Sequence, residues 1–217
     1  MVSVRGQAHT LEAVVAGLLL LSSVVFALQV TAVTPLSAST SSQHVENQQQ
    51  ALAEGMLQRT AHSGALRRAV LFWGDADGDT EREFHCAREG VEYASNPNVT
   101  ACGIAGTANA VHVPPNDFGA AVNETFGTAV AVNVRIRYRT SAGGTDTRRM
   151  VYRGQPSDNA VRVGVTVTLT DDNVLYDPQG EPTDRNVGSG GAAFYADDVG
   201  DGPLFNVLRV EVTVWRI

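Results

Sequence analysis

AVAVNVRIRYR, residues 129–139, decides the fold, because apolar and polar side chains alternate along it without a break. One face carries Val130, Val132, Val134, Ile136 and Tyr138, and the other carries Asn133, Arg135, Arg137 and Arg139. A period of two residues is typical of a strand with one face on a core and the other in water. The stretch therefore predicts a half-buried antiparallel strand.

Two later stretches alternate in the same way. Residues 160–170, AVRVGVTVTLT, place on one face Val161, Val163, Val165, Val167 and Leu169. Residues 208–215, LRVEVTVW, bring together Leu208, Val210, Val212 and Val214. A turn at residues 141–146, SAGGTD, predicts a return strand over Arg148–Arg153 that pairs with the first strand. We expect a four-stranded antiparallel meander, with a long polar loop over Asp171–Gly191 before the last strand.

A sheet with one apolar face needs a cover, and one long amphipathic segment is available for it. From Gln43 to about Phe72, apolar residues recur at helical intervals, at Val45, Leu52, Met56, Ala61, Leu66 and Val70. Gly55 and Gly64 weaken this helix, and Trp73-Gly74 ends it. The fold class is therefore α+β, with this helix packed on the sheet. Two alternatives stay open: a coiled-coil stalk and a small free-standing β-sandwich.

Ahead of that helix lies the most apolar part of the chain. Residues 13–33 read AVVAGLLLLSSVVFALQVTAV and carry no formal charge. As a helix they would extend roughly 31 Å, which is enough to cross the hydrocarbon core of a membrane. Pro35 should end or kink this helix, since proline lacks an N–H and clashes with the preceding turn. The sequence contains no second apolar run of comparable length, so we expect a single span.

The predicted organisation has four parts: residues 1–12 as a cytoplasmic flank, 13–34 as the transmembrane helix, 35–73 as the amphipathic stalk helix, and 74–217 as an extracytoplasmic β-rich domain. The short flank carries one basic residue, Arg5, which should stay inside and send the C-terminal bulk out. We therefore expect a single-pass protein of the cell membrane, with membrane lipid as one partner.

The flank Arg5-Gly6-Gln7-Ala8-His9-Thr10-Leu11-Glu12 runs directly into the apolar segment. This arrangement resembles the start of archaeal type IV prepilins, in which a basic residue and a glycine precede the peptidase cut. The resemblance implies that Arg5 and Gly6 form the cleavage context and that Gln7 becomes the new terminus. It also implies that Glu12 neutralises the terminal amine of a neighbouring subunit, although Glu12 would be sixth in the mature chain and the family places it fifth.

A carboxylate at a helix start suits the helix dipole, and its burial in lipid demands a cationic partner. The resemblance thus implies a pilin-like fold and further copies, or related pilin-like subunits, as partners of the apolar helix. Two other readings of this segment remain: an uncleaved signal anchor, and a signal peptide cut near Val30-Thr31-Ala32.

The charge balance of the chain argues against nucleic-acid binding. It carries 23 acidic and 16 basic residues, a formal net charge of −7, and all of the basic residues are arginine. The arginines look spread through the strands rather than clustered, so a broad basic face is not expected. An acidic, lysine-free composition resembles proteins of salt-loving archaea; a genome rich in G and C is the alternative.

Cys86 and Cys102 are the only cysteines, and they form no CxxC pair. Outside the cell they would close a disulfide loop that stabilises the fold by about 3 kcal/mol. The alternative is two unrelated thiols. The sequons at Asn98 and Asn123 are glycosylation candidates of an exported domain.

Asp75, Asp77 and Asp79 alternate as calcium ligands do. The EF-hand, however, needs a glycine and a glutamate where Thr80 and Cys86 stand. An acidic solvated loop is therefore the better interpretation, and we expect no metal and no cofactor.

None of the five histidines belongs to an HExxH motif, and GxSxG, Walker A and strand-linked GxGxxG motifs are absent from the sequence. We therefore expect no enzyme. The leading hypothesis is a type IV pilin-like subunit, or a pilin-like membrane-anchored surface protein, that acts in assembly and surface contact. The alternative is a monomeric signal-anchored extracytoplasmic binding module.

Overall fold

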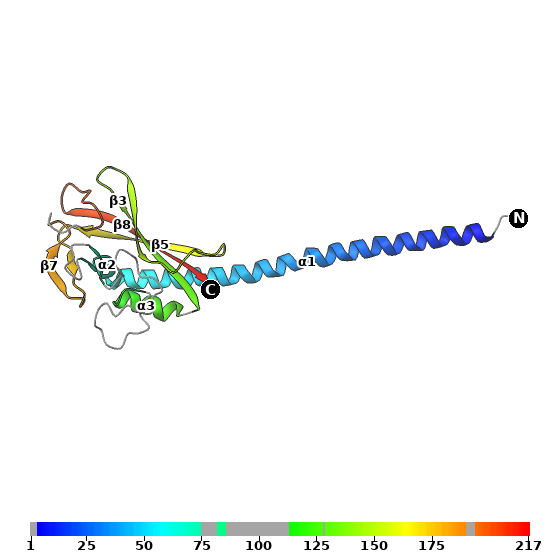
Figure 1. The fold of residues 1–217 in the computed structure, drawn as a ribbon, viewed down its shortest axis with the longest axis horizontal. Helices are drawn as coiled ribbons and strands as arrows, with labels where there is room; N and C mark the ends of the chain where they lie inside the picture. The colour runs from blue at the N-terminus through cyan, green and yellow to red at the C-terminus, as the bar shows by residue number, and fades with distance from the viewer. Residues whose placement is uncertain (1–3, 75–81, 86–112, 128, 190–193) are drawn as a thin grey trace. The chain divides into compact units, whose positions relative to one another are not determined.

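A computed structural model of the chain describes residues 4–74, 82–85, 113–127, 129–189 and 194–217, except for the side chains of residues 4–8 and 30–42. The chain divides into two compact units, residues 1–45 and 46–217. One long helix, α1 (Val4–His62), supplies the whole described part of the first unit and continues into the second (Figure 1).

The second unit is α+β, as the sequence predicted. Its further helices are α2 (Ala65–Val70) and α3 (Asp117–Phe126). The principal sheet has the order β4-β3-β8-β5, and its strands are β4 (Thr145–Val151), β3 (Val130–Arg139), β8 (Leu204–Arg216) and β5 (Val161–Thr170). Two small antiparallel sheets accompany it, made of β1 (Trp73–Gly74) with β2 (Glu83–Phe84) and of β6 (Val174–Tyr176) with β7 (Pro182–Asn186).

The long strands lie where alternation placed them, and β4 pairs with β3 as predicted. The predicted meander is wrong, because β8 lies between β3 and β5 and is antiparallel to both. The central position of β8 fits its sequence, since Leu208, Val210, Val212 and Val214 are all fully buried. A strand with such an apolar row buries the most nonpolar surface when another strand lies on each side of it.

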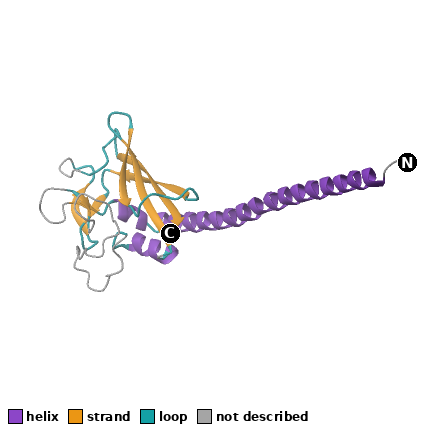
Figure 2. Cartoon of the chain, turned by 45° about the vertical axis from the view of Figure 1, so that its right-hand side comes forward, coloured by secondary structure: helices purple, strands orange, loops and turns teal. Residues whose placement is uncertain are grey.

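Helices cover the apolar face of the principal sheet (Figure 2). Buried side chains of the C-terminal part of α1 and of α2 and α3 share one core with the sheet, among them Ala53, Leu57, Leu66, Phe118 and Val122. Ion pairs connect the helices: Arg68 to Asp117 at 2.6 Å and Arg59 to Glu124 at 3.7 Å. A free-standing β-sandwich is therefore not the fold of this unit.

The amphipathic segment departs from its prediction in two ways. The helix does not run to Phe72: α1 ends at His62 and α2 starts at Ala65, because Gly64 adopts φ 79°, a left-handed conformation that favours glycine. The buried stripe is also rotated, since Leu52 is exposed while Gln49 is buried. The residues that face the core are Gln49, Ala53, Met56, Leu57 and Thr60.

Three other expectations need correction. Pro35 does not end the helix, because α1 continues through it. The segment predicted as a long polar loop contains the hairpin β6–β7. Helix α3 was not predicted, although Asn116 caps it by accepting a hydrogen bond from the Gly119 amide at 3.2 Å, a standard start signal.

Candidate functional site

The first candidate site is the apolar part of α1. Among the described residues, one helical segment is long and apolar enough to cross a membrane, His9–Gln29. None of it is buried within the protein, and its eleven large hydrophobic side chains are between 50% and 70% exposed. The Ser23 hydroxyl donates a hydrogen bond to the Leu20 carbonyl at 2.8 Å, so the helix itself provides the partner of this polar side chain. By length and composition the segment is compatible with a single-pass anchor and with a signal sequence.

Glu12 lies within the first turns of this segment. Its carboxylate is 3.7 Å from Nδ1 of His9, one turn earlier on the same helix, and both side chains are exposed. In an apolar surrounding an ionised carboxylate needs a positive partner. Among the described side chains of α1, the imidazole of His9 is the group that lies beside this carboxylate. Arg5, Gly6 and Gln7 lie in the first two turns of α1; their side chains are outside the described residues, so the cleavage prediction stays a prediction.

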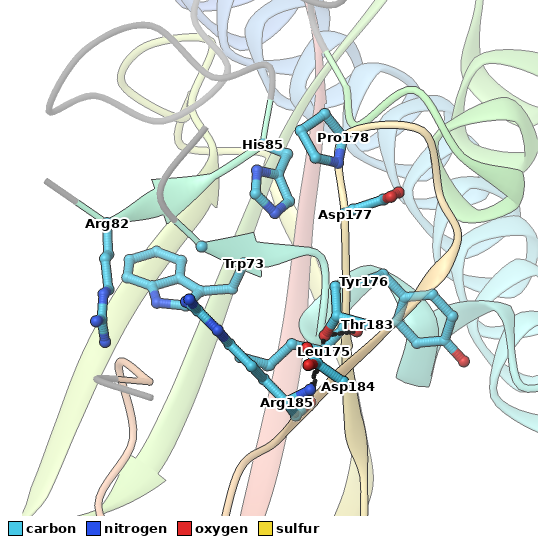
Figure 3. A pocket seen from close by; sticks show the side chains of 11 residues that line it. Trp73, Arg82, His85, Leu175, Tyr176, Asp177, Pro178, Thr183, Asp184 and Arg185 are labelled. Carbon is cyan, nitrogen blue, oxygen red and sulfur yellow. Dashed lines mark hydrogen bonds between the residues drawn. The ribbon is translucent and has the colours of Figure 1, made fainter. Parts of the chain in front are cut away.

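The second candidate is a cavity of about 160 Å³ in the α+β unit (Figure 3). Trp73 and Gly74 of β1 line it together with His85, and the hairpin β6–β7 also lines it, with residues that include Asp177, Thr183 and Arg185. Sequence reasoning could not find this cavity, because its walls come from segments about a hundred residues apart that meet through a main-chain bond from Tyr176 to Leu71.

The geometry around His85 is tight. The ring is buried, meets Phe72 edge to face at 5.1 Å between centroids, and lies directly over Gly74. A Cβ at position 74 would be 3.0 Å from Cε1 of His85. The cavity is smaller than the 300–1,000 Å³ typical of sites for drug-sized ligands, so it has room for a small group at most.

An aromatic cluster supports this end of the domain. Tyr195 lies between Trp73, at 5.0 Å, and Tyr138, at 5.7 Å between ring centroids, and its hydroxyl donates to the Val70 carbonyl at 3.1 Å. Burial raises the pKa of Tyr195 well above its ordinary value, with the neighbouring Tyr138 a smaller cause. Burial also raises the pKa of Tyr138, and Asp146 adds to that effect. Both hydroxyls therefore stay protonated and serve the structure rather than proton transfer at neutral pH.

The arginines are arranged differently from the expectation. Scattered in sequence, Arg135, Arg137, Arg149 and Arg209 are neighbours on β3, β4 and β8. The sheet register produces this grouping, because residues far apart in the chain pair across strands. The prediction that the arginines are not clustered is wrong.

Several predicted sites fall outside the described residues: the Cys86–Cys102 disulfide, the sequon at Asn98, and the calcium candidates Asp75, Asp77 and Asp79. Asn123 lies half-buried in α3, where the sequon residue Thr125 donates its hydroxyl to the Ala121 carbonyl at 2.7 Å. Within the described part of the chain, no group of three or more His, Cys, Asp or Glu side chains could hold a metal ion.

Comparison with known proteins identifies a family. No curated protein and no solved structure matches the chain. The model of one protein family, DUF7288, matches residues 5–214, which include both the apolar helix and the α+β unit. The chain therefore belongs to DUF7288, a family of unknown function.

Proposed function

We propose that this protein is a pilin-like, membrane-anchored surface protein that acts in subunit assembly and surface contact rather than in catalysis. One observation carries the proposal: the side chains of His9–Gln29 find no cover within the protein, although the same helix continues to residues that enter a well-packed core. Transfer of a large hydrophobic side chain out of water is worth about 1.5–3 kcal/mol. The apolar segment therefore needs lipid, the apolar helices of other subunits, or both.

Glu12 is the residue that would make the contact between neighbouring subunits specific. In lipid its ionised form requires a positive charge, and the terminal amine of a neighbouring mature subunit would provide one. Cleavage after Gly6 would expose Gln7 as that amine. His9 at 3.7 Å would hold the carboxylate in place until the subunits meet.

The proposed orientation follows from the flank. Arg5 keeps the N-terminus in the cytoplasm, so the α+β unit faces the outside. That compartment favours the disulfide between Cys86 and Cys102.

Mass spectrometry of the N-terminal peptide of the native protein tests the proposal. A terminus at Gln7 or Ala8 supports the pilin-like subunit. An intact Met1 or Val2 supports an uncleaved anchor, and a terminus at Val33 makes the domain a secreted one.

Assembly is tested with two differently tagged copies of the full-length chain. Glu12→Gln removes the charge and should reduce co-purification of the second tag from detergent extracts. Glu54→Gln is the matched control, because Glu54 lies exposed on the same helix and bonds only locally, to Gln50 at 2.9 Å. Equal co-purification of both variants and the wild type would contradict the assembly role.

The alternative, a monomeric anchored binding module, is favoured by the cavity between β1 and the hairpin β6–β7. It predicts an uncleaved terminus and no co-purification of the second tag under any condition.

A further inference from the structure

The cavity lined by β1 and the hairpin β6–β7 has a buried base and an exposed rim. Trp73, His85 and Leu175 line it and are each at most 5% exposed, so they form the base. Asp184 and Arg185 of β7 also line it but are exposed, so they form the rim. A ligand in this cavity would meet a largely apolar base and a charged rim, an arrangement that orients a small molecule with its apolar end inward.

The size of the cavity limits the apolar part of such a ligand. Its volume is about 160 Å³. An engineered protein cavity of about 150 Å³ takes up one benzene molecule. A single ring, or an aliphatic body of similar size, would therefore fill this cavity, whereas a nucleotide or an oligosaccharide is too large for it.

Arg185 is the cationic group of the rim that is available to a ligand. Its main-chain amide donates to the Thr183 hydroxyl at 3.2 Å, but within the described part of the chain its guanidinium forms no ion pair and no hydrogen bond. Figure 3 shows its side chain extending from the hairpin toward Trp73. A guanidinium is a planar fork of N–H donors whose geometry matches that of a carboxylate.

Two carboxylates that line the cavity limit the charge of the ligand. Asp177 is held within its own turn, because its Oδ1 accepts from the amides of Gln179 at 2.9 Å and Glu181 at 2.8 Å. Its carboxylate points away from His85 (Figure 3). Asp184 is exposed at the rim. Both carboxylates repel an anion, and the repulsion grows with each charge that the anion carries. A ligand with a single negative charge is therefore favoured over phosphate or another multiply charged anion.

We propose that this cavity binds a small organic monocarboxylate, with its apolar body against Trp73 and Leu175 and its carboxylate beside the guanidinium of Arg185. Arg82 and His85 also line the cavity but have interactions of their own, so Arg185 is the group to which the carboxylate contact is assigned. The site goes beyond the proposed assembly function and does not depend on it.

Titration of the full-length protein in detergent micelles with benzoate tests this site. Benzamide and benzylamine are matched probes, because they carry the same ring with a neutral group and with a positively charged group. The indole N–H signals of the two tryptophans give the readout: Trp73 lines the cavity, whereas Trp215 lies in β8. We expect benzoate to shift the signal of Trp73 and not that of Trp215. Benzamide and benzylamine should bind about tenfold more weakly, because they lack the charge-assisted contact with the guanidinium.

Three substitutions at exposed positions sharpen the test. Arg185→Gln should weaken benzoate binding about tenfold, because it removes the positive charge and the fork of donors. Asp184→Asn should strengthen it about threefold, because it removes a like charge from the rim. Arg67→Gln is the matched control, since Arg67 is exposed on α2 and does not line the cavity, and it should leave the affinity unchanged. All three variants should keep the melting temperature of the wild type.

Equal affinity of benzoate for the wild type and Arg185→Gln would overturn the proposal. Tighter binding of benzylamine than of benzoate would overturn it as well, as would a shift of Trp215 alone. Uptake of benzoate by the micelle would give the same apparent affinity in every variant and is therefore the same negative result. Any of these outcomes would leave the anchored pilin-like role standing, because N-terminal mass spectrometry and co-purification report on that role separately.

Discussion

The side chain of Asn206 completes the hydrogen bonding of the Arg139 backbone at the end of β3. Its Oδ1 accepts from the Arg139 amide at 3.2 Å, and its Nδ2 donates to the Arg139 carbonyl at 2.9 Å. The regular pairing of β3 with β8 stops two residues earlier, at Arg137 and Arg209. A side-chain amide thus extends the ladder where the main chain of β8 no longer can.

Asn206 is fully buried and makes a third bond, from Nδ2 to the Asp197 carbonyl at 2.7 Å. Asn206→Ala should lower the free energy of unfolding by about 3 kcal/mol, because it leaves buried backbone groups unsatisfied. Chemical denaturation of the full-length protein in detergent, followed by tryptophan fluorescence, measures the change. Asn159→Ala, at an exposed position, is the control and should change little.

Gly74 is predicted to be intolerant of alanine. The new methyl group would press on the buried ring of His85, which Phe72 already holds from another side. Gly74→Ala should therefore destabilise the domain by about 1–2 kcal/mol. Gly55→Ala, in α1 with open space around its Cβ, should instead stabilise it by about 0.5–1 kcal/mol. The melting temperature of Gly74→Ala should therefore lie below that of the wild type, and that of Gly55→Ala above it. A higher melting temperature for Gly74→Ala would contradict the contact between residue 74 and His85.

Asp197 should make the domain sensitive to acid. The backbone amide of Ser141, at 2.8 Å, and then its hydroxyl, at 2.9 Å, donate to the carboxylate and hold the pKa of Asp197 below its ordinary value. A carboxyl whose pKa is depressed by folding contributes stability above its unfolded pKa of about 3.9, and that contribution is lost as the pH falls through the lower folded pKa.

Asp197→Asn should accordingly lower the melting temperature at pH 7 by roughly 2 °C, and the difference from the wild type should shrink below pH 4. Thermal unfolding followed by circular dichroism over pH 3–7 measures both. A difference that stays constant over this range would show that the charge of Asp197 plays no part.

The long strands and the apolar helix could be predicted because each pattern is local. Alternation from Val130 to Arg139 and the uncharged run before Pro35 report directly on burial and on length. The α3 helix could also have been found, from the Asn116 cap and the spacing of Phe118, Val122 and Phe126.

The order of the strands could not be predicted from such patterns. β8 lies between β3 and β5 because of pairings between residues up to 86 positions apart, such as Val130 and Arg216, and no local signal specifies them. The same holds for the cavity and for the grouping of the arginines. The cavity needs the hairpin β6–β7 to reach Leu71, and the arginines become neighbours only when residues such as Arg137 and Arg209 pair across β3 and β8.

The break at Gly64 and the exposure of Leu52 have the same cause, which is the tertiary packing of the stalk helix. A glycine near a helix end can be a weak interior residue or a stop, and tertiary packing decides which. The rotation of the stripe follows from the same packing, which favours the row that contains Ala53 and Leu57 over the row that contains Leu52.

Protease treatment of intact cells tests most directly whether the apolar helix anchors an exported domain. With the protein tagged at each end in separate strains, the account predicts that added protease removes the C-terminal tag and the α+β unit, while the shortened remainder stays with the membrane fraction. A C-terminal tag that survives on intact cells, together with recovery of the full-length protein in the soluble cytosolic fraction, would contradict it.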